Sequence, residues 1–213
     1  MNQIAVPTKN PGELFIPALN KTFLQVEVRE DDVYDTVQLE AAAIAAGTEF
    51  EFFRNIENKN EQHTNMAQAR RIAAGDEVAV FRIGLHPREA QGNVLPNSAD
   101  IKKVFGNAHF ILKFNRRIIA DGPAIKFPSG LGLSGSSNEV AAAGLQYTSV
   151  GVPSVAAAPT LFVPQQLGER DDISAKLRFP GAAWVAGYAV PTTAEDLLVS
   201  LMLHGVIKSP LGK

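Results

Sequence analysis

Two stretches near the C-terminal end of the sequence alternate apolar and polar residues. Between Asp172 and Phe179 an apolar residue occupies every second position, with serine, lysine and arginine between them. The stretch Asp196–Ile207 alternates again and is largely apolar on both faces. Because successive side chains of a strand point to opposite faces of its sheet, the first stretch predicts a half-buried strand. The second predicts a strand at the centre of a sheet, so we expect a β domain.

The remaining chain contains further short segments with the same period of two. They predict strands at Lys21–Arg29, Thr48–Arg54, Glu77–Leu85, Ala108–Ile119 (two strands around a tight turn at Asn115-Arg116), Pro123–Phe127 and Thr160–Val163. The acidic cluster that begins at Glu30 is expected to form a solvated turn. Residues 36–46 are ambiguous between helix and strand, and Ala99–Phe105 is expected to form a short helix ended by Gly106.

About eight short strands separated by loops of unequal length favour a Greek-key arrangement over an even meander. We therefore predict an all-β fold: an antiparallel β-sandwich, arranged as an eight-stranded single jelly roll with one or two short helices. Residues 1–20 carry three prolines and only two charges, which predicts an extended N-terminal arm. Residues 21–213 are expected to form a single β-sandwich domain. The arm is too apolar for a solvated tail, and the sequence leaves open whether it packs on its own domain or on a neighbouring subunit.

Composition narrows the function classes. The chain has no cysteine, which excludes a disulfide scaffold and any thiolate metal site. Its formal net charge is -2, so we expect no direct nucleic-acid binding, which needs a clustered basic surface. No apolar run is long enough for a membrane-spanning helix, and no signal peptide is expected.

The motifs that could carry chemistry are weak. Residues 130–135 match G-x-G-x-x-G, but a dinucleotide site needs a strand before the glycines, a helix after them and an acidic residue about twenty positions on. The four histidines (His63, His86, His109 and His204) have no metal-ligand spacing. No G-x-S-x-G is present. We therefore predict that the chain is not an enzyme, and we assign no catalytic, cofactor-binding or metal-binding residue.

Three segments carry a family resemblance. One predicted strand ends at Phe179-Pro180, a turn follows, and a final strand ends with Leu203–Pro210. Together with Thr64-Asn65-Met66 and the segment 126–132, this pattern resembles the single jelly-roll capsid proteins of tailless icosahedral bacterial viruses. The resemblance implies a capsid subunit of a bacteriophage virion, without catalytic residues. Its partners would be copies of itself and other shell proteins, and a neutral arm would suit a shell around an internal membrane surface.

Apolar residues outside the expected core predict where such a subunit would meet its neighbours. The interface candidates are Leu14, Phe15, Ile16, Phe162, Trp184 and Tyr188. One alternative is a carbohydrate- or ligand-binding β-sandwich module of a fibre or appendage, which would use Trp184 and Tyr188 as an aromatic platform. A second is an enzyme on a cupin-like barrel, with metal held by the histidines.

Overall fold

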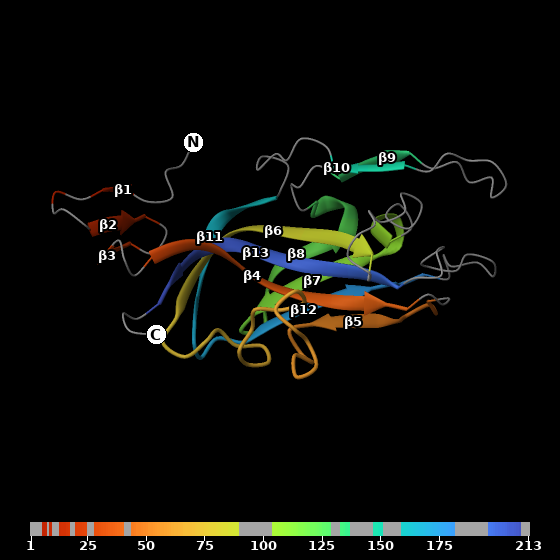
Figure 1. Ribbon diagram of the computed structural model, residues 1–213, viewed down its shortest axis with the longest axis horizontal. Coiled ribbons are helices and arrows are strands. Elements are labelled where there is room, and N and C mark those ends of the chain that lie inside the picture. Colours follow the sequence, from red (N-terminus) through yellow and green to blue (C-terminus); the bar gives the residue numbers. More distant parts are fainter. Residues whose placement is uncertain are drawn as a thin grey trace.

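The computed structural model describes most of the chain and consists mainly of antiparallel strands (Figure 1). The residues described are 6–7, 9, 13–17, 20–24, 28–40, 44–89, 104–128, 133–136, 147–150, 159–181 and 196–209. Two four-stranded sheets pack face to face. The predicted all-β antiparallel sandwich is therefore confirmed.

The first sheet has the strand order β11-β6-β13-β4. Its strands are β4 (Val28–Leu39), β6 (Glu77–Glu89), β11 (Thr160–Gly168) and β13 (Leu197–Lys208). As its apolar pattern predicted, β13 is a central strand that pairs antiparallel with both β4 and β6. The acidic cluster expected as a turn lies within β4, which also takes in the ambiguous residues 36–39. The turn prediction was wrong because pairing with the long, apolar β13 extends β4 through its own polar residues.

The second sheet has the order β5-β12-β7-β8. Its strands are β5 (Glu49–Phe52), β12 (Ile173–Arg178), β7 (His109–Phe114) and β8 (Arg117–Pro123). The predicted tight turn between β7 and β8 is confirmed: Asn115 and Arg116 both have positive φ, at 49° and 69°. Two such residues form the hairpin turn whose twist matches that of the flanking strands.

Side chains from both sheets form one apolar core. Phe52, Phe110 and Leu112 from the second sheet and Leu85 and Leu201 from the first are at most 1% exposed. In β7 and β12, buried and half-buried residues alternate, as expected for strands with one face on the core. Among the described residues, side chains from both sheets therefore pack against one another and fill the space between the sheets.

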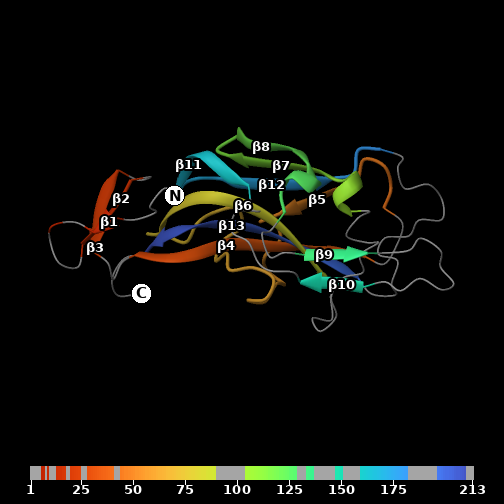
Figure 2. The same cartoon turned by 90° about the horizontal axis from the view of Figure 1, so that it is seen from above.

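The region before the sandwich forms a small sheet of its own. It contains β1 (Val6–Pro7), β2 (Glu13–Ile16) and β3 (Lys21–Leu24), in the order β1-β2-β3. Figures 1 and 2 both show this sheet beyond one end of the sandwich. The segment predicted as one strand from Lys21 to Arg29 supplies β3 and the start of β4, and residues 25–27 between them lie outside the described part.

The remaining described elements are short. Strands β9 (Leu133–Ser136) and β10 (Tyr147–Val150) pair as an antiparallel ladder, at the other end of the molecule from β1–β3 (Figure 2). A 3₁₀ helix, η2 (Ala124–Lys126), replaces the strand predicted over Pro123–Phe127. Residues 104–107 are helical, so Gly106 lies inside that helix and does not end it.

Candidate functional site

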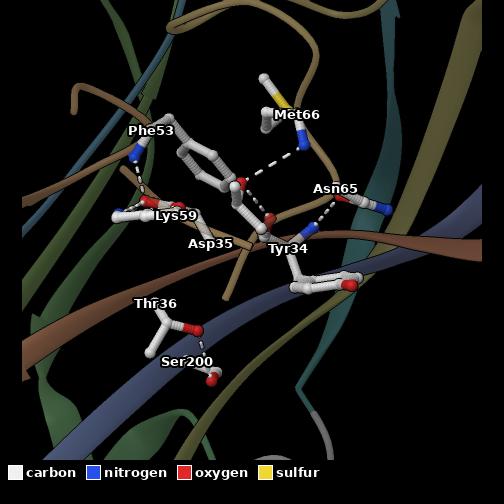
Figure 3. A network of polar contacts seen from close by, with 9 residues as sticks. Tyr34, Asp35, Thr36, Phe53, Lys59, Asn65, Met66 and Ser200 are labelled. Atoms are coloured by element: carbon white, nitrogen blue, oxygen red, sulfur yellow. Dashed lines mark hydrogen bonds and ion pairs between the residues drawn. The ribbon is translucent and has the colours of Figure 1, made fainter. Parts of the chain in front are cut away.

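The most extensive polar network in the described residues lies where β4 and β5 form one open side of the sandwich (Figure 3). At its centre is Asp35 of β4, whose side chain is 0% exposed. The Asp35 carboxylate accepts hydrogen bonds from Lys59 Nζ at 2.8 and 2.7 Å and from the Phe53 backbone N–H at 2.6 Å. These three groups connect β4 to the loop that follows β5.

Asp35 occupies a position of β4 that faces the core, where an apolar residue is expected. It shares the inward face of β4 with Val33 and Val37, which both belong to the core. A carboxylate taken out of water is costly unless it is paired and hydrogen-bonded. Lys59 and the Phe53 N–H supply these partners, so the ion pair holds the loop against the sandwich.

The backbone of the loop is constrained at the same point. Phe53 is wholly buried and has φ 62°, a left-handed conformation that costs a non-glycine residue about 1–2 kcal/mol. The Arg70 N–H donates to the Phe53 carbonyl at 2.7 Å, and the Ile173 N–H donates to the Arg70 carbonyl at 2.8 Å. The loop is thus anchored to β12 as well as to β4.

The same loop covers the free edge of β4. Asn65 accepts a hydrogen bond from the Tyr34 N–H at 2.9 Å and donates from Nδ2 to the Asp32 carbonyl at 2.5 Å. Thr64 Oγ1 donates to the Tyr34 carbonyl at 3.1 Å, and the Tyr34 hydroxyl donates to the Glu61 carbonyl. An edge strand exposes unpaired backbone groups that invite pairing with another chain, and these contacts occupy them. We call the set Asp35, Phe53, Lys59, Thr64 and Asn65 the edge clasp.

Two polar pairs lie on the outer face of the first sheet. Thr36 Oγ1 and Ser200 Oγ are 2.8 Å apart, and both residues are buried. His204 Nδ1 lies 2.8 Å from Asp32 Oδ1, on the neighbouring strand. The Thr36–Ser200 pair satisfies two buried hydroxyl groups, whereas the His204–Asp32 pair is partly open to solvent.

A cavity of about 420 Å³ lies beside the edge clasp. Its walls include Glu49, Glu51, Asn55, Lys59 and His63. The carboxylates of Glu49 and Glu51 are engaged with Lys176, at 2.7 and 3.1 Å, and Lys59 is engaged with Asp35. The charged groups that line this cavity are therefore already engaged in ion pairs with one another or with neighbouring side chains.

The outer face of the second sheet carries an ion-pair network. Hydrogen bonding to the Lys176 ammonium holds the pKa of the Glu49 carboxyl below its ordinary value of 4.5. Partial burial opposes ionisation of Glu51, but hydrogen bonds from Arg54 and Lys176 outweigh it and leave the pKa of Glu51 lowered. Hydrogen bonds to Glu49 and Glu51 in turn raise the pKa of Lys176. This face therefore remains charged over a wide pH range.

The structure describes four of the six predicted interface residues, three of them in β2. Leu14 and Phe15 lie in β2, where Phe15 is half-buried, and Phe162 lies in β11. Ile16 is wholly buried against Ala79 and Val206 of its own chain. Trp184 and Tyr188 lie outside the described residues.

The other sequence candidates also remain apart. His86 and His204 lie in neighbouring strands of the first sheet but are not opposite each other, because His86 pairs with Ser200 and His204 with Arg82. His109 lies in the second sheet, and His63 lies in the loop after β5. Within the described part of the chain, no three histidine, aspartate or glutamate side chains group as metal ligands. Gly135, from the glycine-rich motif, lies inside β9.

Sequence reasoning missed the edge clasp. One signal was present: Asp35 stands between Val33 and Val37 at inward positions of one alternating segment. A charge at such a position implies a buried partner. The identity of that partner depends on the path of a loop that carries no periodic pattern.

The described structure is thus an antiparallel β-sandwich of two four-stranded sheets, in which a loop anchored by the Asp35–Lys59 ion pair covers the edge of β4. No family model, curated protein or solved structure matches this chain. Across the residues that the structure describes, no helix has the length and apolar character needed to cross a membrane.

Proposed function

We propose that this chain is a structural subunit of a viral capsid, built on a single jelly roll and assembling with copies of itself. The strand pairing carries the proposal. Counted along the chain, the first sandwich strand pairs with the last (β4 with β13) and the second with the seventh (β5 with β12). The third pairs with the sixth (β6 with β11) and the fourth with the fifth (β7 with β8). This is the order of one long antiparallel ribbon folded over into two sheets, and jelly rolls of this kind recur in viral capsids, lectins and cupins.

The N-terminal region also supports assembly. It forms its own sheet beyond the end of the sandwich, and it contacts the outer face of the first sheet through Ile16. Its strands pair only with one another among the described residues. A region that forms its own sheet beyond the sandwich is suited to reach between subunits, and a bacteriophage virion is the setting that the family resemblance suggests.

Chemistry at the edge clasp favours a structural protein over an enzyme. The Asp35 carboxylate and the Lys59 ammonium neutralise each other, and the other hydrogen bonds of the edge clasp join side chains to the backbone of the same chain. A carbohydrate-binding module would instead present exposed aromatic rings, and its candidates Trp184 and Tyr188 lie outside the described residues.

Sedimentation velocity over a concentration series tests the proposal. The full chain is expected to form oligomers or closed particles, and deletion of residues 1–20 is expected to reduce assembly while leaving the sandwich folded by circular dichroism. The proposal fails if the full chain remains a compact monomer at high concentration and the deletion changes neither assembly nor stability. A glycan array with specific binding that is lost in Trp184→Ala would favour the carbohydrate-binding module instead.

A further inference from the structure

The cavity beside the edge clasp reaches down to buried residues and has a partly apolar wall. Thr36 and Leu198, which line it, are only 3% and 4% exposed. The Phe50 ring also lines the cavity and packs edge-to-face against Phe179, with 6.0 Å between the ring centroids. One aromatic ring of the wall is therefore held in a fixed orientation. The cavity volume of about 420 Å³ lies within the range of about 300–1,000 Å³ that is typical of small-molecule sites.

The carboxylates and the ammonium group of this cavity are already paired. Glu49 and Glu51 lie 2.7 and 3.1 Å from Lys176 Nζ. Lys59 Nζ lies 2.7 Å from the Asp35 carboxylate. An ionic ligand would have to compete with these ion pairs, whereas a ligand without charge leaves them intact. The electrostatics of the cavity therefore favour a neutral ligand.

Two amide side chains supply hydrogen-bonding groups that the protein itself does not use. Asn55 and Asn58 both line the cavity and are exposed. Neither side chain forms a hydrogen bond with another residue of the described ranges. An amide presents two N–H donors and a carbonyl acceptor, and a hydroxyl group both donates and accepts. The two amides therefore match a ligand that is rich in hydroxyl groups.

The segment that carries both amides is fixed at its two ends by the edge clasp. The Phe53 N–H and Lys59 Nζ both donate to the Asp35 carboxylate. Between these anchors, the Lys59 N–H donates to the Ile56 carbonyl at 3.0 Å and closes a turn that contains Asn58. A site whose groups are positioned in advance loses less conformational entropy when its ligand binds. The edge clasp thus holds both amides beside the cavity.

We propose that this cavity binds a neutral saccharide. Asn55 and Asn58 bond its hydroxyl groups, and the Phe50 ring packs against the apolar C–H face of a sugar ring. The inference goes beyond the proposed function, because a shell subunit with such a site would attach to a glycan-coated surface. It also differs from an aromatic platform at Trp184 and Tyr188, since it assigns binding to other residues.

A glycan array that carries neutral, sialylated and sulfated glycans tests the ligand class with the fluorescently labelled full chain. We expect neutral glycans to be bound. Isothermal titration calorimetry with the free saccharide of the strongest neutral glycan then measures the affinity. Asn55→Ala and Asn58→Ala should each weaken binding by about two- to tenfold, and the double variant by about tenfold or more, because each removes hydrogen bonds between neutral groups. Raising NaCl from about 50 to about 500 mM should change the affinity by less than about twofold, since no charge pairs with the ligand.

Two variants serve as controls. Arg170→Ala changes an exposed side chain that does not line the cavity, and Trp184→Ala removes the ring of the alternative platform. Both should bind the saccharide as wild type does. Circular dichroism checks the fold of every variant, and the asparagine variants should fold normally because both side chains are exposed.

The saccharide site is wrong if no glycan is bound above background, if only anionic glycans are bound, or if the asparagine variants bind as tightly as wild type. Loss of binding in Trp184→Ala alone would move the site to the aromatic platform. A free monovalent saccharide gains nothing from assembly, so its affinity is independent of the oligomeric state. A monomer that binds the saccharide keeps this inference and contradicts the capsid proposal, whereas an assembling chain that binds no glycan does the reverse.

Discussion

Replacing Lys59 with methionine should strongly destabilise the sandwich. The change removes both hydrogen bonds from Nζ to Asp35 and leaves a carboxylate that is 0% exposed without its counter-ion. Removing one partner of a buried ion pair costs about 3–5 kcal/mol. Because the Lys59 side chain is 19% exposed, water can partly replace it, so we expect a value near the lower end, about 3 kcal/mol.

Urea unfolding followed by circular dichroism measures this loss. With a slope of about 2–3 kcal/mol per molar urea, the midpoint should fall by about 1–1.5 M. In the double variant Asp35→Leu/Lys59→Met the buried charge is absent, and the remaining cost is the unpaired Phe53 N–H, about 1–3 kcal/mol. The double variant should therefore be more stable than the sum of the two single changes predicts, by at least about 2 kcal/mol.

Arg170→Ala is the matched control, because Arg170 is 94% exposed and lies 3.9 Å from Glu169. An exposed pair of this kind contributes at most about 1 kcal/mol. If Lys59→Met shifts the midpoint no more than Arg170→Ala does, or if the two single changes are simply additive, the edge clasp does not hold the loop as described.

Three further predictions concern stability. Gly205→Ala should cost about 2 kcal/mol or more, because an added Cβ would lie 2.4 Å from the Ala79 carbonyl oxygen; an unchanged melting temperature would contradict that close approach. Arg116→Gly should stabilise by about 0.5–1 kcal/mol, because Arg116 has φ 69° in the hairpin turn, and a lower melting temperature would count against this turn geometry. The lowered pKa of Glu49 contributes stability above the ordinary value of 4.5 that is lost as pH falls through the lower, folded-state value. Glu49→Gln should therefore flatten the decline in melting temperature below about pH 4.5, and an unchanged acid slope would contradict the Lys176–Glu49 contact.

The sequence predicted those parts of the fold that depend on local pattern. Strict alternation predicted β12, and an apolar character on both faces predicted the central place of β13. The polar dipeptide Asn115-Arg116 predicted the tight turn. In each case the cause is short-range: the period of a strand or the dihedral angles of two residues.

Features set by distant pairing were harder to predict. The acidic residues of β4 were predicted as a turn because their composition is typical of one. The twelve-residue ladder with β13 that holds them extended is a long-range pairing and leaves no local signal. Pro123–Phe127 read as a strand, whereas the chain there turns through η2 to reach the edge of β6. The Asp35–Lys59 pair joins residues that come together only because a non-periodic loop folds back over β4. Its existence could be suspected from Asp35 alone, but its partner could not.

Negative-stain electron microscopy of the purified full-length chain tests the proposed function most directly. We predict closed particles of uniform diameter, or discrete oligomers that become fewer when residues 1–20 are deleted. A field of single sandwich-sized molecules at every concentration would contradict the proposal that this protein is a self-assembling shell subunit.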